Sequence, residues 1–243
     1  MSTYILVPGL WLGAWAWRDV TAHLRAAGHE VHPLTLTGLA DRRHLAGAGV
    51  TLDTHIEDIV RLILAEDLHD VVLVGHSGGG VPVTGAADRV PERIRKIVYL
   101  DSGPLPDGAS LLDANEPEGR ALIESRIAGG APYPFPAWEE HRMLGASDEG
   151  LDEEVKRSVA ARATPHPAGA ITRPLRLTGA ADRLPKALVT CSFPLDQVKA
   201  LIAQGHPLFA PLAGPEWELL EVPTGHWPMF SRPTATAEAL ASV

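Results

Sequence analysis

The sequence contains a single cysteine, Cys191, which excludes disulfides within the chain and metal sites built from several cysteines. It also lacks any apolar run close to about 18 residues, the length that a membrane-spanning helix needs. The first residues carry neither a basic region nor a cleavable apolar segment, so no secretion signal is visible. We therefore expect a cytoplasmic protein that does not act at a membrane.

Positive charge is scarce as well. The 243 residues include 21 Lys and Arg against 30 Asp and Glu, which gives a net charge of −9. Because no basic stretch offsets this balance, nucleic acid is not expected as a partner. Apolar residues make up 45% and charged residues 21%, as in an ordinary folded protein, and the length suits one large domain.

Short β-branched runs alternate with amphipathic stretches, which is the pattern of parallel strands joined by crossover helices. Strands are expected at residues 4–7, 30–36, 71–74, 94–100, 187–191 and 217–222. Thr54 and Glu57 predict the capped start of one helix, and further helices are expected at 195–204 and after Pro233. The fold class is therefore α/β, with a mostly parallel sheet, helices on both faces and one domain over residues 1–243.

Residues 104–174 interrupt this alternation. The segment holds nine of the 21 prolines, with helical stretches at 119–127 and 151–163 among them. We interpret it as a lid inserted into the α/β domain. Its apolar stretch at 132–138 is either a hydrophobic surface for the substrate or simply lid packing.

The sharpest motif is GHSGG at residues 75–79, which fits G-x-S-x-G and directly follows the expected strand at 71–74. A serine on a strained turn from strand to helix needs small neighbours, because larger side chains would prevent the turn from closing. Such a turn exposes the hydroxyl and presents helix N–H groups to a developing oxyanion. We interpret Ser77 as a nucleophile; the alternative is a glycine-rich turn with an incidental serine.

Cofactor and metal patterns do not fit this sequence. The glycines at 75–80 lack G-x-G-x-x-G spacing, G-x-x-x-x-G-K-[ST] is absent, and no tyrosine is followed by lysine four residues on. Residues 29–32 read HEVH, which is not the zinc-binding H-E-x-x-H. We expect neither a cofactor nor a metal.

A nucleophilic serine needs a base, and His226 is the best placed of the 11 histidines. It follows the last expected strand, and in the chain order nucleophile, acid, histidine the base comes last, on a loop beyond that strand. Other histidines, such as His23, His55 and His69, are expected on solvated helix faces.

These segments resemble the α/β-hydrolase fold, and more closely the compact branch that holds plant methyl-ester esterases and hydroxynitrile lyases. The likeness rests on residues 7–17 (VPGLWLGAWAW), on the turn at Ser77 and on residues 226–233 (HWPMFSRP). It implies an oxyanion hole formed by the backbone N–H groups of Leu10 and Gly78.

The first loop departs from the family pattern at one position. Pro8 stands where the family usually has a histidine before the glycine, which leaves the backbone donor role of Leu10 intact. Trp15 and Trp17 are expected in the core, whereas Trp11 is expected to line the substrate pocket.

The acid of the expected triad has two candidates. The common family position lies just beyond the strand at 187–191, but residues 192–195 read SFPL. Asp196 comes next, where a carboxylate is also explained as the charge at a helix start. Asp101 directly follows the strand at 94–100, and some members of the fold place the acid there. We favour Asp101 and keep Asp196 as the alternative.

The predicted function is a serine carboxylic-ester hydrolase in which Ser77, His226 and Asp101 act on a small hydrophobic ester or lactone through an acyl-enzyme. Two alternatives remain: a carbon–carbon lyase like the hydroxynitrile lyases, and a non-catalytic ligand receptor on the same fold. By resemblance, those lyases use a lysine after the catalytic histidine and a threonine in the first loop. This chain has Trp227 and Gly9 there. A small-molecule ester is the expected partner, and a homodimer is left open.

Overall fold

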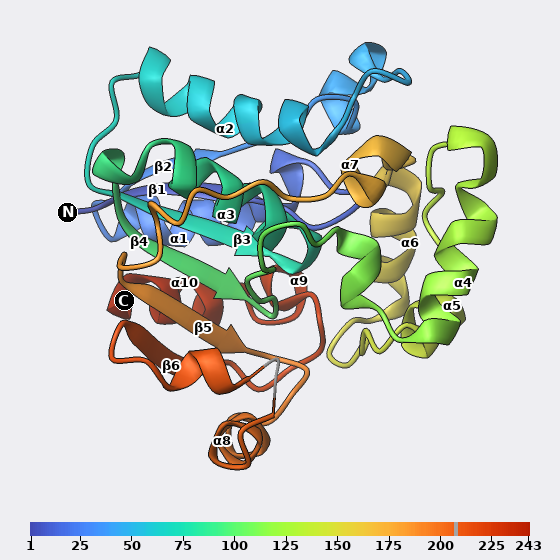
Figure 1. Cartoon of the computed structure of the whole chain (residues 1–243). Helices are drawn as coiled ribbons and strands as arrows, with labels where there is room; N and C mark the ends of the chain where they lie inside the picture. The colour runs from blue at the N-terminus through green and yellow to red at the C-terminus, as the bar shows by residue number, and fades with distance from the viewer. Residues whose placement is uncertain (207–208) are drawn as a thin grey trace.

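The computed structural model describes residues 1–206 and 209–243. Its centre is a six-stranded sheet in the order β2-β1-β3-β4-β5-β6, and all the described pairings are parallel (Figure 1). The strands are β1 (Thr3–Val7), β2 (Glu30–Pro33), β3 (Val71–His76), β4 (Ile94–Leu100), β5 (Lys186–Thr190) and β6 (Trp217–Glu221). The predicted α/β class is confirmed. The edge strand β2 ends earlier than expected, at Pro33, whose missing N–H is spared because the Leu34 N–H makes the next bond to β1, to the Leu6 carbonyl at 3.0 Å.

Helices cover both faces of this sheet. They are α1 (Arg18–Ala26), α2 (Leu52–Ala65), α3 (Gly80–Arg89), α4 (Pro117–Arg126), α5 (Trp138–Met143), α6 (Glu153–Arg162), α7 (Ala168–Thr172), α8 (Leu195–Ala203), α9 (Pro228–Ser231) and α10 (Pro233–Ser242). Successive strand residues point to opposite faces. Ile5 and Val7 therefore pack with α2 and α3, whereas Tyr4 and Leu6 pack with α1 and α10. Trp17 lies fully buried in the second cluster, as expected of a core residue.

The start of α2 differs from the prediction. Thr51 is the N-cap, and it forms a capping box with Thr54 rather than Thr54 forming one with Glu57. His55 in the next turn is 1% exposed, so the expected solvated position is wrong. Its Nε2 lies 2.9 Å from the carbonyl oxygen of Thr37, and its ring packs edge-on against His166 at 5.4 Å.

Residues 104–174 contain α4 to α7, which lie beyond the carboxyl ends of β3 and β4 (Figure 1). The segment builds a third hydrophobic cluster in which Ile123, Tyr133 and Ile171 pack with Trp11 of the first loop. It therefore contacts the α/β core at the edge of the sheet where the strands end.

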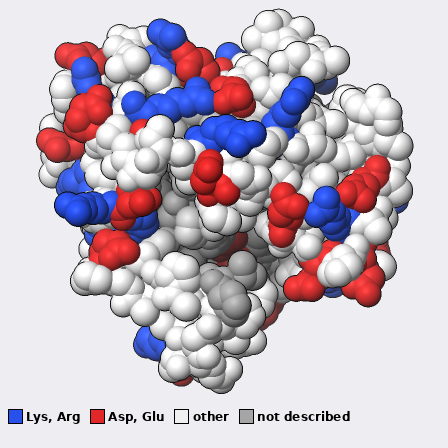
Figure 2. Space-filling model, in the orientation of Figure 1, with Lys and Arg blue, Asp and Glu red and all other residues white. Residues whose placement is uncertain are grey.

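The surface carries mixed charge. On the face seen in Figure 2, Lys and Arg side chains are interspersed with Asp and Glu rather than gathered into one basic patch. Among the described residues, no helix is both long enough and apolar enough to cross a membrane.

Candidate active site

Ser77 occupies a strained turn between β3 and α3. Its φ is +51°, in the left-handed region that side chains other than glycine rarely adopt. The turn closes only because its neighbours lack side chains. A Cβ on Gly75 would lie 2.7 Å from the backbone oxygen of Gly79, and one on Gly79 would lie 2.5 Å from that of Pro8. The sharp turn leaves Ser77 partly exposed at the end of the strand.

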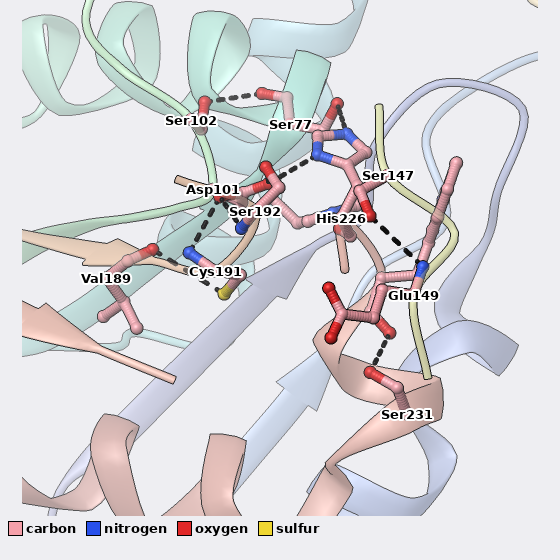
Figure 3. A network of polar contacts seen from close by, with 12 residues as sticks. Ser77, Asp101, Ser102, Ser147, Glu149, Val189, Cys191, Ser192, His226 and Ser231 are labelled. Carbon is pink, nitrogen blue, oxygen red and sulfur yellow. Dashed lines mark hydrogen bonds and ion pairs between the residues drawn. The ribbon is translucent and has the colours of Figure 1, made fainter. Parts of the chain in front are cut away.

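His226 joins Ser77 to Asp101. The His226 Nε2 lies 2.8 Å from Ser77 Oγ, and its Nδ1 lies 2.6 Å from Asp101 Oδ2 (Figure 3). His226 follows β6 on a loop that residues 147–149 hold in place. The His226 N–H donates to the Ser147 carbonyl at 2.7 Å, and the Gly225 N–H donates to the Glu149 carbonyl at 3.1 Å.

Asp101 turns out of the end of β4 with a φ of +43°, and its side chain is 5% exposed. Its Oδ1 accepts the backbone N–H groups of Cys191 and Ser192, at 2.9 and 3.0 Å, and its Oδ2 accepts the Ser192 hydroxyl (Figure 3). Burial opposes ionisation of Asp101. The hydrogen bond and charge of His226, together with the Ser192 and Cys191 donors, outweigh it and hold the pKa of Asp101 well below its ordinary value.

The other acid candidate lies elsewhere. Asp196 is in the first turn of α8, its side chain is fully exposed, and it lies 4.0 Å from Lys199. The structure therefore brings Asp101, and not Asp196, to the side of the His226 ring that faces away from Ser77.

The first loop lies directly against the Ser77 turn. A Cβ on Gly9 would lie 3.0 Å from Ser77 Cβ, and one on Gly78 would lie 2.9 Å from the Leu10 side chain. Among the described residues, nothing accepts a hydrogen bond from the Leu10 N–H. Gly78 is the second residue of the helical turn that begins at Ser77, where N–H groups have no partner inside a helix. Two free backbone donors thus lie beside the Ser77 hydroxyl.

The sequence matches the Alpha/beta hydrolase family over residues 4–239, which is nearly the whole chain. The chain belongs to the alpha/beta hydrolase family. Over 249 residues, which span 100% of both chains, the hydrolase is 34% identical to the carbendazim hydrolyzing esterase of Nocardioides sp. (strain SG-4G). It is 37% identical to methyl jasmonate esterase 1 of Vitis vinifera over 109 residues, which are 43% of this chain and 41% of that protein.

Solved structures show the same fold. An extracellular alpha/beta-hydrolase from a Paenibacillus species superposes with a TM-score of 0.84 at 23% identity, covering 100% of the hydrolase and 98% of that chain. A methylesterase from Arabidopsis gives a TM-score of 0.71 at 21% identity, with coverage of 100% and 98%. These structures bear on the fold; the family match and the 34% identical relative confirm the predicted family and an esterase-type hydrolase.

A small cavity of about 10 Å³ lies beside the Leu10 and Gly78 donors, which is room for about one water molecule. Its walls are mostly apolar, and two buried histidines, His55 and His166, also line it. Among the described residues that form these walls, Trp11 does not appear. The Trp11 ring packs against Tyr133, Phe135 and His141, and its Nε1–H donates to the Tyr133 carbonyl oxygen at 3.1 Å. The backbone N–H of Trp11 donates to His166 Nδ1 at 3.3 Å.

Two residues of the hydrolase site escaped the sequence reasoning. His76 is 1% exposed, and its Nε2 lies 2.7 Å from the His226 carbonyl oxygen, so this contact helps to fix the His226 loop in place. Burial and the nearby His226 lower the pKa of His76 far below its ordinary value, which keeps it neutral. Ser192 supports Asp101. In the sequence, only the positions of these two residues could have pointed to their roles. His76 is the variable residue before the serine of G-x-S-x-G, and Ser192 stands where the family usually has its acid.

Within residues 1–206 and 209–243 of the hydrolase, no group of three His, Cys, Asp or Glu side chains is placed so that it could hold a metal ion. The one thiol, on Cys191, is buried, and burial raises the pKa of this thiol above its ordinary range.

Proposed function

We propose that this hydrolase cleaves small carboxylic esters with Ser77 as nucleophile, His226 as general base and acid, and Asp101 as the group that orients His226. The observation that carries the proposal is the continuous hydrogen-bonded chain from Ser77 Oγ through both nitrogens of His226 to Asp101 Oδ2, at 2.8 and 2.6 Å. The strained φ of Ser77 and the free donors beside it support the same roles.

The proposed reaction has two steps. Ser77 Oγ attacks the ester carbonyl carbon while His226 Nε2 takes its proton, and the Leu10 and Gly78 N–H groups stabilise the negative oxygen. The carbon–oxygen bond to the alcohol then breaks, and the alcohol leaves with the proton from His226. Water next attacks the acyl-enzyme, gives its proton to His226, and releases the acid as Ser77 regains its hydrogen.

Asp101 has a proposed role in both steps. His226 becomes positively charged when it takes a proton, and an ionised carboxylate 2.6 Å from its Nδ1 stabilises that charge. The lowered pKa of Asp101 keeps the carboxylate ionised at neutral pH. The same hydrogen bond fixes the tautomer, with the proton on Nδ1 and the lone pair of Nε2 facing Ser77.

We propose a small, largely apolar ester or lactone as the substrate. The cavity beside the proposed oxyanion donors has room for little more than a methyl-sized group, and leucine and proline side chains dominate its walls. The names of the relatives, a carbendazim hydrolyzing esterase and a methyl jasmonate esterase, are consistent with a small alcohol as the leaving group. Residues 104–174 are proposed as the lid, since residues 147–149 hold the His226 loop.

The test is a series of p-nitrophenyl esters of increasing chain length, assayed with wild type and with Ser77→Ala. Wild type should prefer the short esters, and Ser77→Ala should lose about 10⁴- to 10⁶-fold in kcat with an unchanged thermal midpoint. Carbendazim and methyl jasmonate belong in the same panel. Hydrolysis that survives the substitution would refute the proposed nucleophile.

A lyase reaction is tested in the same way. The residue after His226 is Trp227, which is 3% exposed and packs edge-on against the His226 ring at 5.0 Å. An indole cannot supply the positive charge that stabilises a departing cyanide. We therefore expect no Ser77-dependent release of cyanide from mandelonitrile above the buffer rate, and such release would establish a lyase instead.

A further inference from the structure

An aromatic cluster lies next to the proposed catalytic base. It consists of Trp11, Phe135, Trp138, His141 and Trp227, whose rings pack at centroid distances of 4.7 to 5.5 Å. Three of its members come from segment 104–174, and Trp227 directly follows His226 in the chain. The Trp227 ring packs edge-on against the His226 ring at 5.0 Å, so the cluster contacts the proposed base.

His141, on α5, is the polar member of this cluster. It is 2% exposed, and it contacts Phe135 at 4.7 Å, Trp11 and Trp227 at 5.1 Å and Trp138 at 5.4 Å. Burial, followed by the nearby His226, lowers the pKa of His141 to about 4. At neutral pH it is an uncharged imidazole with one N–H donor and one acceptor nitrogen.

One ring nitrogen of His141 has no hydrogen-bond partner among the described residues. That nitrogen is Nε2, which is buried. Each of the other buried histidines has a hydrogen-bond partner. His55 Nε2 pairs with the Thr37 carbonyl, His166 Nδ1 with the Trp11 backbone N–H, and His76 Nε2 with the His226 carbonyl.

An unpaired buried polar atom is costly, since it has lost its water without gaining a partner. A leucine or phenylalanine would fill the same space without that cost. One further histidine nitrogen near His226 is unpaired, Nδ1 of His76, but it lies against Gly9, where a Cβ would be only 2.9 Å away. The ring contacts of His141 are with aromatic side chains.

We propose that His141 determines substrate specificity by forming a hydrogen bond with a donor or acceptor atom on a planar aromatic ring of the ester. The inference rests on the proposed function. Aromatic faces around a single hydrogen-bonding group are typical of sites for flat, mostly apolar ligands with one polar atom. An entering ring takes the place of one of the present ring contacts, and its polar atom satisfies the imidazole.

The test compares methyl benzoate with two matched esters, methyl nicotinate, which adds a ring acceptor, and methyl 3-hydroxybenzoate, which adds a donor. Wild type should favour at least one of the two over methyl benzoate by about tenfold or more in kcat/KM, as expected for one hydrogen bond. In His141→Phe this preference should fall to about twofold or less, because kcat/KM falls further for the favoured ester than for methyl benzoate.

Two control variants distinguish hydrogen bonding from packing. His141→Gln keeps polar atoms and should retain part of the preference, whereas His44→Phe replaces an exposed histidine outside the cluster and should retain all of it. Thermal midpoints establish that each variant folds. An equal preference in wild type and His141→Phe, or no preference in wild type, would overturn the proposal.

A binding measurement keeps this result independent of catalysis. The Ser77→Ala protein, with and without His141→Phe, is titrated with the same three esters, and binding is followed by tryptophan fluorescence. The second substitution should weaken binding of the favoured ester about tenfold more than binding of methyl benzoate. If no ester is hydrolysed in a Ser77-dependent manner, the proposed function fails while this titration still decides the role of His141. Unchanged affinities, or no binding at all, would contradict that role.

Discussion

Asp101 and Ser192 lie at the ends of two neighbouring strands, and the Ser192 hydroxyl donates a hydrogen bond of 2.5 Å to Asp101 Oδ2. Ser192 stands just beyond β5, where the family usually carries its acid, while the carboxylate here comes from β4. The two strands pair in parallel, with Leu100 opposite Val189, so both ends open at the same edge of the sheet. A carboxylate from either strand can therefore face the same side of His226.

The first prediction concerns the identity of the acid. Asp101→Asn should lower kcat by about 10⁴-fold, because the amide leaves His226 in the wrong tautomer and without support when charged. Asp196→Asn should be nearly silent, since that side chain is fully exposed on α8. Steady-state rates on a short ester, with circular dichroism to establish folding, check both variants. The reverse ranking would make Asp196 the acid.

The second prediction concerns Ser192. Its hydroxyl and N–H both donate to the Asp101 carboxylate, at 2.5 and 3.0 Å, so it fixes the position of the acid. Ser192→Ala should lower kcat about tenfold and leave KM nearly unchanged, as expected for one hydrogen bond to a charged group. Ser242→Ala, on the exposed face of α10, is the matched control. A wild-type kcat in Ser192→Ala would show that the N–H donors suffice.

A third prediction concerns the packing of the Ser77 turn against the first loop. A Cβ at residue 79 would lie 2.5 Å from the Pro8 backbone oxygen, which cannot move away without displacing the loop. Gly79→Ala should lower the free energy of unfolding by about 1–3 kcal/mol and reduce activity as well. Gly103→Ala is the control, because nothing lies within 4 Å of a Cβ there. Urea unfolding that finds both variants equally stable would contradict the close approach.

The fourth prediction concerns stability in acid. Burial keeps four histidines neutral by lowering their pKa values below the ordinary value: His55, His76, His141 and His166. Between the ordinary and the lowered pKa the unfolded chain binds more protons, so their contribution is complete above about pH 6.5 and is lost as the pH falls. Each histidine can contribute up to about 1.4 kcal/mol per pH unit.

Urea unfolding at pH 7, 6 and 5 measures this loss. The free energy of unfolding should fall steeply between pH 6.5 and 5, and His141→Phe should show a shallower decline because one of the four groups is gone. A free energy that is the same at pH 7 and pH 5 would show that these histidines are not held neutral.

The fold could be predicted from the sequence because its strands are short β-branched runs between helices with one apolar side. β3 and β4 lie close to the expected residues, and the parallel sheet is confirmed. His55 shows where such reasoning fails. Periodicity along α2 placed it on a solvated face, but His166, more than a hundred residues further along the chain, packs over it and buries it.

The candidate site was accessible to sequence reasoning where a local pattern exists. The glycines around Ser77 and the position of His226 after the last strand are such patterns. The choice between Asp101 and Asp196 depends on which strand end faces the imidazole, and this is a property of the assembled sheet. The bracing by His76 and Ser192 is likewise a long-range contact, and His141 acquires its surroundings only when segment 104–174 packs against the first loop.

The central claim is that Ser77 is the nucleophile, and covalent labelling tests it most directly. The intact protein is treated with a serine-reactive p-nitrophenyl phosphonate, and its mass and the modified peptide are then measured. We predict the addition of one phosphonyl group per chain, located on Ser77, with loss of esterase activity in proportion to labelling and no labelling of Ser77→Ala. A label on any other residue, or equal labelling of Ser77→Ala, would contradict the account.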